Sequence, residues 1–444
     1  MNFFDKQPLF RIVSVFLLIV FGMGSRCFAD YDYINISEPF TKKIPLAVPV
    51  FKNLSGAPGG GEIAVDAADL LGRALDFTGY FKIIDRGAYL ERPEQKGITI
   101  AEIDFKNWTD IGTELLVTGG LRLEGEVLQL EFRLFDPFKG ELLLGKRYTG
   151  NPSDLRKMVL RFCGEMIFRL TGKYGIFNSS IAFVSTTQGG KTIYMCDFDG
   201  SNLQRVVDPE SILLFPAWSP DGKMIAYTSY KNGKPDIFVK PVPRGSGKVL
   251  VSYKGMNITP VWVPGQSTMA ATLSYEGDEE IYLLTPSGKV AKRLTKSWGV
   301  DVSPTFSPDG RQMAFVSNRS GSPQIYVMNL DTGQERRLTY EGTYNTQPDW
   351  SPAGDRIVYS GMKKGISDIY AIALDGGGPM QLTRGEGRNE APSWSPDGSL
   401  IVFASTRDGV SDIYVMTGYG TDQRRLIEMP GEQTLPAWSP NIGE

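Results

Sequence analysis

The chain has 444 residues, a formal net charge of −3 and 41% hydrophobic residues, which is enough for two or three domains with ordinary cores. The nearly balanced charge argues against a large electrostatic footprint for nucleic acid or anionic lipid. The sequence contains no histidine, which excludes Ser-His-Asp and Cys-His catalysis, His-ligated zinc and the facial-triad iron site. Carboxylate-only catalysis and oxygen-ligated calcium remain open.

Residues 1–29 are typical of a removable signal peptide. Basic residues precede an apolar run over residues 12–21, which is shorter than the roughly 20 residues that span a bilayer. Cys27-Phe28-Ala29 supplies a small-x-small cleavage site, and Arg26 occupies the position where a lipoprotein signal needs a small residue. We therefore expect a soluble, exported protein that starts near Asp30.

Residues 30–173 predict a small α/β domain, preceded by a mobile tail over residues 30–43. Strand-like and helix-like segments alternate here without an internal repeat. Apolar residues recur at a period of about 2 in the strands and about 3.6 in the helices. We expect strands at Leu46–Phe51, at Tyr80–Asp85 and around 128–134, helices at Ala64–Phe77 and around 155–170, and a hinge near 174–180.

Two short motifs and the two cysteines of the mature chain have functional interpretations that the sequence does not favour. Gly56–Gly61 lacks the Lys-Ser/Thr of a P-loop and the GxGxxG frame, so it predicts a flexible strand-to-helix connection. Asp197–Asn202 resembles part of a calcium loop, but its glycine spacing fails and a hairpin turn is favoured. Cys163 and Cys196 have no CxxC spacing, so two buried free thiols are favoured over a disulfide.

A repeat of 44 residues fills the chain from about residue 174. Each copy predicts four strands joined by turns, beginning with a short inner Pro-x-Trp strand and a Ser-Pro-Asp-Gly turn. A period of about 40–45 residues with strand-like segments is typical of propeller blades. The opening proline of the repeat stands at Pro216, Pro260, Pro304, Pro348, Pro392 and Pro436.

The two ends of the repeat segment complement each other. The first copy, which begins at Ile181, lacks a Pro-x-Trp strand, whereas Pro436-Ala437-Trp438 supplies an additional one. We expect this last strand to insert into the first blade and close the ring. The sequence therefore predicts an α/β N-terminal domain followed by a six-bladed all-β propeller over residues 174–444, closed by the C-terminal strand.

The repeat offers few signs of catalysis. Five tryptophans could form a carbohydrate platform, but their strict repeat position predicts packing between blades: Trp218, Trp262, Trp350, Trp394 and Trp438. No Gly-x-Ser-x-Gly occurs, so a serine peptidase with a propeller cap is not supported. We assign no catalytic residue and no metal ligand. The enzyme alternative that stays open is an exported propeller that acts on oligosaccharides by carboxylate acid/base catalysis.

The segments just before each Pro-x-Trp are expected to line one mouth of the propeller channel. They vary while the strands repeat, as binding loops on a rigid scaffold do. Their mixed polar character suits recognition of a polypeptide segment that enters the channel. The candidate residues are Met256, Asn257, Thr259, Asp301, Val302, Ser303, Asn345, Gln347, Asn389, Glu390 and Gln433.

The repeats, with Ser-Pro-Asp-Gly at Ser307–Gly310 as an example, resemble WD40-like propeller repeats. Together with the signal segment and an α/β domain that contains Ile44–Phe51, they resemble the TolB family. This resemblance implies a periplasmic, non-enzymatic adaptor of the Tol-Pal system of Gram-negative envelopes, which supports outer-membrane integrity and constriction during cell division. It also implies that the lipoprotein Pal binds at the propeller mouth, and it would permit calcium in the channel.

The resemblance further implies that the tail reaches the inner-membrane protein TolA, through Asp30, Tyr31, Tyr33, Ile34 and Ile36. Because apolar residues alternate in this tail, we hypothesise that its docking on the body competes with partner binding and couples TolA to Pal. Other envelope proteins are further candidate partners. We expect a monomer that neither binds nucleic acid nor inserts into a membrane.

Overall fold

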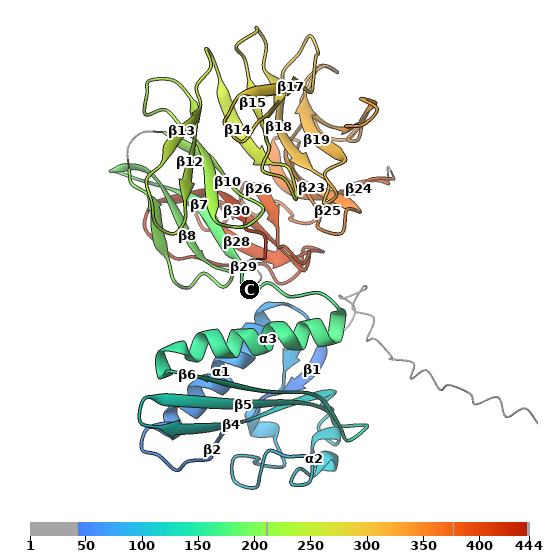
Figure 1. Ribbon diagram of the computed structural model, residues 1–444. Helices are drawn as coiled ribbons and strands as arrows, with labels where there is room; N and C mark the ends of the chain where they lie inside the picture. Colours follow the sequence, from blue (N-terminus) through green and yellow to red (C-terminus); the bar gives the residue numbers. More distant parts are fainter. Residues whose placement is uncertain (1–42, 210–211, 376, 442–444) are drawn as a thin grey trace, which may run out of the picture. The chain divides into compact units, whose positions relative to one another are not determined.

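The computed structural model describes residues 43–209, 212–375 and 377–441 (Figure 1). The predicted signal peptide and the tail residues Asp30, Tyr31, Tyr33, Ile34 and Ile36 lie outside the described residues. Two kinds of architecture follow each other along the chain. A mixed sheet with helices comes first, and six four-stranded sheets come after it.

The first part is an α/β domain in which two helices cover one face of a six-stranded sheet (Figure 1). The strand order is β3-β1-β4-β5-β6, and β2 pairs with β4. Strand β1 is parallel to β3 and β4, whereas β4, β5 and β6 form an antiparallel meander. The elements are β1 (Ile44–Ala47), β2 (Lys52–Asn53), α1 (Gly60–Phe77), β3 (Phe81–Ile83), a short 3-10 helix (Arg86–Ala88), α2 (Phe105–Thr109), β4 (Leu115–Glu124), β5 (Val127–Asp136), β6 (Glu141–Gly150), a second 3-10 helix (Pro152–Asp154) and α3 (Leu155–Thr171).

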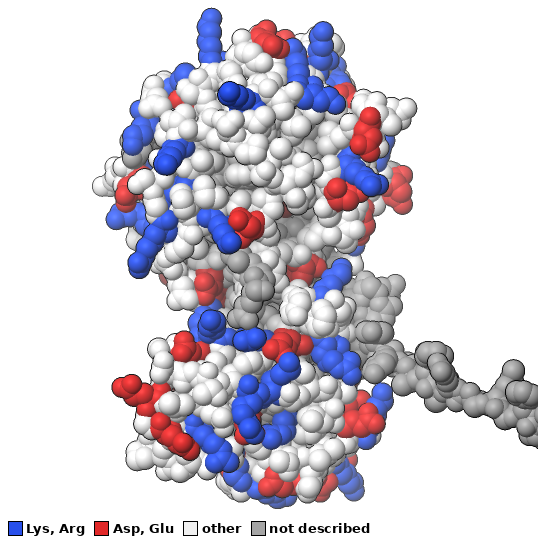
Figure 2. Space-filling view, viewed as in Figure 1, with Lys and Arg blue, Asp and Glu red and all other residues white. Residues whose placement is uncertain are grey.

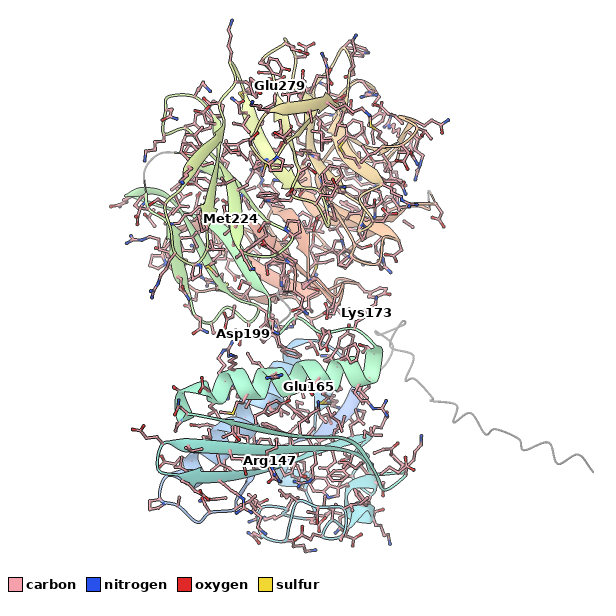
Figure 3. All side chains as sticks on the ribbon, viewed as in Figure 1. Arg147, Glu165, Lys173, Asp199, Met224 and Glu279 are labelled. Carbon is pink, nitrogen blue, oxygen red and sulfur yellow. The ribbon has the colours of Figure 1, made fainter. Side chains whose placement is uncertain are left out.

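The alternation of apolar residues in β5 places one set of side chains against the helices. Phe132 is fully buried and its ring stacks on Phe162 of α3 at 4.7 Å between ring centroids. On α3, Glu165 (labelled in Figure 3) accepts a hydrogen bond of 3.0 Å from the Tyr148 hydroxyl of β6. Helix α3 ends at Thr171 and is capped by Gly172, whose φ of 74° is a left-handed conformation that glycine adopts without strain.

Helix α1 begins four residues earlier than the sequence predicts. The glycine-rich run does form the strand-to-helix connection, but its last two residues, Gly60 and Gly61, already belong to α1. Gly59 stands at the N-cap with φ 77°. A run of glycines gives no apolar period, so the periodicity that marks α1 becomes visible only from Ala64 onward.

The second part consists of six four-stranded antiparallel sheets, which confirms the prediction of a six-bladed propeller (Figure 1). Within each sheet the first strand in order is innermost and carries the Pro-x-Trp stretch or its equivalent. Five blades follow the chain directly: β10 (Leu213–Trp218), β11 (Met224–Ser229), β12 (Asp236–Pro241) and β13 (Lys248–Val251); β14 (Asn257–Trp262), β15 (Met269–Leu273), β16 (Glu280–Leu284) and β17 (Val290–Arg293); β18 (Asp301–Phe306), β19 (Gln312–Ser317), β20 (Gln324–Asn329) and β21 (Glu335–Arg337); β22 (Tyr344–Trp350), β23 (Arg356–Lys363), β24 (Ile366–Ala373) and β25 (Met380–Gln381); β26 (Asn389–Trp394), β27 (Leu400–Ser405), β28 (Asp412–Thr417) and β29 (Arg424–Arg425).

The remaining blade closes the ring as predicted. It has the order β30-β7-β8-β9, with β30 (Glu432–Trp438), β7 (Ser180–Thr187), β8 (Gly190–Asp197) and β9 (Gln204–Val207). The antiparallel register pairs Trp438 with Ile181 and Glu432 with Thr186. The Trp438 indole N–H donates a hydrogen bond of 2.8 Å to the Ser179 hydroxyl, so the closing strand is fixed by a buried side chain as well as by its ladder.

The repeated tryptophans pack between blades. Trp350 of β22 lies in one buried cluster with Val316 of β19 and Ile325 of β20 in the preceding blade. The Trp218 indole N–H donates a hydrogen bond of 3.0 Å to the carbonyl of Ala437 in the neighbouring blade. These contacts agree with the packing interpretation of the tryptophans.

The remaining local predictions can also be checked. Cys163 and Cys196 are buried and free, which confirms the prediction of two unpaired thiols. Asp197–Asn202 forms the turn between β8 and β9, in which the Asp197 N–H donates to the Ser201 carbonyl and the Gly200 N–H donates to the Asp197 carbonyl. Within the described ranges, no helix is long and apolar enough to cross a membrane.

Candidate polypeptide-binding site at the propeller channel

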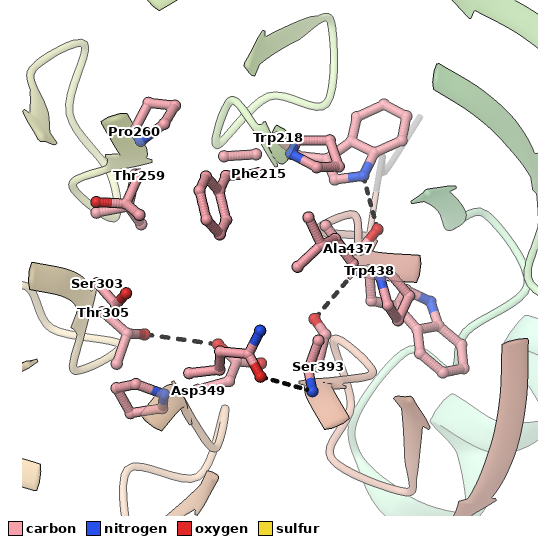
Figure 4. Close-up of a pocket in the computed structure, with 18 of the residues that line it drawn as sticks. Phe215, Trp218, Thr259, Pro260, Ser303, Thr305, Asp349, Ser393, Ala437 and Trp438 are labelled. Carbon is pink, nitrogen blue, oxygen red and sulfur yellow. Dashed lines mark hydrogen bonds between the residues drawn. The ribbon is translucent and has the colours of Figure 1, made fainter. Parts of the chain in front are cut away.

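A cavity of about 280 Å³ is lined by all six innermost strands (Figure 4). The middle residue of each Pro-x-Trp stretch, or of its equivalent in β18, contributes to its wall. These six equivalent residues differ in polarity from blade to blade. They are Ala217, Val261, Thr305, Asp349, Ser393 and Ala437.

The wall of the channel is therefore polar on one side and apolar on the other. Thr305, Asp349 and Ser393 come from three consecutive blades, β18, β22 and β26, and form the polar side (Figure 4). Alanine and valine occupy the other three positions, and Phe215 and Leu435 add to the apolar side. A rigid ring with two unlike sides can orient a ligand that itself has an apolar and a polar part.

Asp349 is held in a fixed orientation. Its Oδ2 accepts a hydrogen bond of 2.7 Å from the Trp394 backbone N–H, and its Oδ1 accepts one of 3.5 Å from the Thr305 hydroxyl. Burial in the channel wall raises the pKa of the Asp349 carboxyl to about 6, while hydrogen bonds from Trp394 and Ser393 oppose this rise. The carboxylate is thus oriented by neutral donors in a partly dehydrated place.

A strained backbone feature recurs in every blade next to the channel. The residue before each ring proline has φ between 48° and 54°, in the left-handed region that favours glycine, although none of the six is a glycine. The strand register shifts at the same point, as in the step between Leu214 and Ala217, so each innermost strand carries a bulge. The six residues are Phe215, Thr259, Ser303, Gln347, Ala391 and Leu435.

This conformation costs about 1–2 kcal/mol for a residue with a side chain, and the following proline normally pushes its neighbour toward extended backbone. All six residues line the channel. The bulges therefore turn side chains of the innermost strands toward the cavity at an energetic cost that the surrounding blades offset.

Five of the predicted mouth residues are not accessible, which corrects the sequence-based expectation. They occupy the first positions of innermost strands, or the second in β22 and β30, and each is at most 1% exposed. The physical reason is that four of the side chains, all amides, hydrogen-bond the chain segment that connects one blade to the next, whereas Asp301 bonds Arg319 of its own blade. The five residues are Asn257, Asp301, Asn345, Asn389 and Gln433.

Asn389 illustrates this structural role. Its Nδ2 donates to Asp368 Oδ1 at 3.0 Å, and its Oδ1 accepts from the Ser405 hydroxyl at 2.7 Å and from Arg407 Nη2 at 3.1 Å. Gln433 similarly donates from Nε2 to the Gly431 carbonyl at 2.7 Å. These polar side chains bind the blades together and do not face solvent.

Asp301 departs from this amide pattern. Its Oδ2 accepts a hydrogen bond of 2.7 Å from Arg319, while its Oδ1 is buried without a partner. Burial, and to a lesser degree the nearby Glu280 carboxylate, raise the pKa of the Asp301 carboxyl, although Ser317 and Arg319 oppose the rise. Among the five buried polar residues, Asp301 is thus the one whose charged form is disfavoured by burial.

The other six predicted residues have mixed placements. Thr259, Ser303 and Gln347 line the channel, as expected of mouth residues. Thr259 is nevertheless buried, and its hydroxyl bonds that of Thr272 at 2.7 Å. The remaining three residues are half-buried and do not line the channel. They are Met256, Val302 and Glu390.

Sequence reasoning missed the exposed apolar side chains at the same end of the propeller. The loops before the innermost strands, and those between second and third strands, meet at this end because Asp301 at the start of β18 pairs with Ser317 at the end of β19. Trp298 is 76% exposed and Tyr340 is 73% exposed. We call the following set the rim residues: Ile212, Trp298, Tyr340, Tyr344, Ile366 and Val410.

The charges on the face seen in Figure 2 give no competing site. Figure 2 shows Lys and Arg interspersed with Asp and Glu over the visible face, without a continuous area of one sign. This distribution agrees with the net charge of −3. Exposed aromatic residues around a channel are a stronger indication of a binding surface than these mixed charges, because aromatic residues are enriched where proteins bind proteins.

The fold and the channel define a class of two-part proteins in which a small α/β domain precedes a six-bladed propeller. The comparisons with known proteins identify the family. The family model described as the TolB beta propeller domain matches residues 168–442, and the one described as the TolB amino-terminal domain matches residues 32–143. The chain belongs to the TolB family.

Curated relatives and one solved structure agree with this assignment. The chain is 54% identical over 233 residues to a "Tol-Pal system protein TolB" of Desulfosudis oleivorans, which covers 52% of this chain and 53% of that protein. It is 43% identical over 227 residues to a protein of the same name in Syntrophus aciditrophicus, with 50% of each chain covered. The chain spans about half the length of these curated relatives that it matches. The crystal structure of TolB from Acinetobacter baumannii has a TM-score of 0.79 and 27% identity, and the match covers 90% of this chain and 97% of that one.

Proposed function

We propose that this protein is a periplasmic, non-enzymatic adaptor of a Tol-Pal envelope system, which supports outer-membrane integrity and constriction during cell division. The observation that carries the proposal is the match of the whole propeller, residues 168–442, to the TolB propeller family. The relatives' printed name, Tol-Pal system protein, gives the system. Signal-peptide features in residues 1–29 support export.

The rim residues and the channel support Pal as the partner that docks on the propeller. Trp298 and Tyr340 project from neighbouring inter-blade loops and are largely exposed. Tryptophan and tyrosine are the residues that most often dominate binding energy at protein interfaces. A rigid ring of blades presents them without the ordering cost of a flexible loop.

The tail supports a separate contact with TolA, through Asp30, Tyr31, Tyr33, Ile34 and Ile36. Its alternating apolar residues suit an extended segment that adds to a partner's sheet edge. Deleting residues 30–37 should abolish TolA binding and leave the melting temperature of the protein unchanged. Unchanged affinity for TolA would refute the tail as the contact.

The enzyme alternative is weaker. Acid/base hydrolysis of a glycosidic bond needs a pair of carboxyl groups about 5–10 Å apart on either side of the substrate. Asp349 is the single carboxylate among the residues that line the channel of the described structure. We therefore propose an adaptor rather than an oligosaccharide hydrolase.

Calcium in the channel stays a prediction of the family resemblance. Ca²⁺ prefers six to eight oxygen ligands, usually with several carboxylates. The lining residues supply one carboxylate, and the described part of the chain contains no group of three His, Cys, Asp or Glu side chains that could hold a metal. The residues of this channel do not fit a calcium ion held by protein ligands alone, and we derive no step through it.

The proposal is tested by titrating the exported chain, residues 30–444, with the soluble domain of Pal in a calorimeter. Trp298→Ala and Tyr340→Ala should each weaken binding by about 2 kcal/mol or more, roughly 30-fold. Leu203→Ala is the matched control, because Leu203 is a 41% exposed apolar residue in the β8–β9 connection at the opposite end of the blade. Equal affinity of all three variants and the wild type would place the binding face elsewhere.

A further inference from the structure

The channel contains one charged side chain without a counter-charge. Asp349 is the single ionisable residue among those that line the cavity. No ion pair found among the described residues includes it, and its hydrogen-bond donors, Thr305, Ser393 and the Trp394 N–H, are all neutral. A carboxylate in a partly dehydrated wall is attracted to any cation that can reach it.

Four other buried carboxylates of the propeller are each paired with a cation of the chain. Glu280 is paired with Arg293 at 3.0 Å, Asp301 with Arg319 at 2.7 Å, and Asp412 with Arg425 at 3.1 Å. Asp236 is paired with Lys234. The chain thus supplies its own cation to these four acids. Buried Asp368, like Asp349, has only neutral donors, among them Gln381 and Thr383, but Asp349 is the one of the two that lines the cavity.

Asp349 presents its carboxylate to the cavity with neutral donors alone around it. These donors are the Thr305 and Ser393 hydroxyls and the backbone N–H groups of Trp350 and Trp394. Asp349 lies in the cavity wall between Thr305 and Ser393 (Figure 4). A cationic group that enters the channel therefore meets a carboxylate whose charge no neighbouring cation balances.

The opposite wall restricts the kind of cation. Val261, Phe215 and Leu435 line the apolar side of the same cavity. A hydrated metal ion gains nothing from such a wall, whereas the side chains of lysine and arginine carry a charged tip on an apolar stem. The cavity of about 280 Å³ is near the lower limit of ligand pockets, about 300 Å³, and suits one side chain rather than a folded segment.

We propose that the channel receives a lysine or arginine side chain of the polypeptide that docks on the propeller, with Asp349 as its counter-charge. The identity of the docking polypeptide in this inference rests on the proposed function. The chemistry of the channel does not depend on it. Asp349 acts as a specificity-determining residue, because a partner with a neutral or acidic side chain at this point leaves the carboxylate dehydrated and unpaired.

The direct test uses the exported chain, residues 30–444, with ¹³C-labelled aspartate carboxyl groups, and follows the Asp349 signal by NMR. N-acetyl-lysine methylamide should shift this signal saturably. N-acetyl-norleucine methylamide, which has the same stem without the ammonium group, should bind at least about tenfold more weakly. Equal binding of the two probes would show a merely apolar channel, and a saturable shift by CaCl₂ without one by the lysine probe would show a metal site; either result overturns the proposal.

Two variants separate this inference from the proposed function. Asp349→Asn keeps an acceptor for the Trp394 N–H, and it should weaken the lysine probe and the soluble domain of Pal by about tenfold or more. Asp331→Asn, at an exposed carboxylate between β20 and β21 outside the channel lining, should bind both as the wild type does. Pal binding that is insensitive to Asp349→Asn refutes the inference and leaves the proposed function intact. Lysine-probe binding without Pal binding refutes the proposed function and leaves the channel chemistry intact.

Discussion

Replacing Asn389 by leucine tests whether the buried polar ring is structural rather than part of a binding mouth. Asn389 is fully buried, and leucine has a similar size, so the substitution changes hydrogen bonding more than packing. It removes the bonds to Asp368, Ser405 and Arg407. Asp368 keeps donors from Gln381 and Thr383, but the Ser405 hydroxyl loses its acceptor.

The expected loss follows from these contacts. Each buried polar group that is left without its partner costs about 1–3 kcal/mol. With Asp368 partly compensated and Arg407 still bonded to Gln423 at 2.8 Å, the total loss is about 3–5 kcal/mol. For a unit the size of this propeller, that corresponds to a decrease in Tm on the order of 10 °C.

The assay is thermal and urea unfolding of the exported chain, followed by tryptophan fluorescence. Glu390→Ala is the control, because Glu390 is half-buried, its ion pair with Arg388 is exposed, and its loss should change stability by about 0.5 kcal/mol or less. A leucine variant that unfolds with the wild type, but no longer binds Pal, would refute the structural role and return Asn389 to the binding mouth.

Three further predictions concern other features of the propeller. Trp438→Ala should lower the free energy of unfolding by about 3–5 kcal/mol, because it removes a buried aromatic side chain from the closing strand; an unchanged urea midpoint would contradict the role of that strand. Ala391→Gly should raise the free energy of unfolding by about 0.5–1 kcal/mol, because Ala391 has φ 53°. Ala404→Gly in the regular strand β27 is the control and should lower it by a similar amount. A loss of stability in both variants would show that the bulge is unstrained. The pKa of Asp301 is raised in the folded state, so its contribution to stability is greatest at low pH and is lost as the pH rises through the folded pKa. The stability of Asp301→Asn relative to the wild type should therefore increase as the pH rises above the ordinary pKa of aspartate, about 4, and a constant difference in denaturation curves would contradict the raised pKa.

The sequence predicts the propeller well because a propeller is defined by its period. Six copies in one register give the number of blades, and the missing strand before Ile181 predicts the partner of Pro436-Ala437-Trp438. The packing of Trp350 between blades also follows from register alone, because a residue fixed at one repeat position sits in one structural environment.

The repeat register also marks the five buried polar residues at the start of the innermost strands. Asn257, Asp301 and Asn389 are separated by whole multiples of the 44-residue period. Amides and acids that recur at one repeat position indicate a shared structural contact. They were expected at the mouth because polar residues next to variable segments resemble binding loops. Burial of an amide depends on the carbonyls and side chains brought to it by other strands, and single-sequence patterns do not contain that information.

No sequence pattern predicts the left-handed backbone conformation of the residues that precede the prolines. The six positions hold Phe215, Thr259, Ser303, Gln347, Ala391 and Leu435, which share neither size nor polarity. None is glycine or asparagine, the usual markers of this conformation. The bulge is imposed by the closed ring of blades rather than by local preference, and it becomes visible only in three dimensions.

The pairing of β30 with β7 makes the order of the blades along the chain interchangeable. A circularly permuted propeller could begin in the loop between β25 and β26 and carry a short linker from Trp438 to Ser180. It would have the same six blades, with its chain ends between the sheets of β25 and β26. In such a permuted protein the sheet that contains Ile181 would be continuous in the chain, and mechanical pulling on the ends would peel away a different blade first.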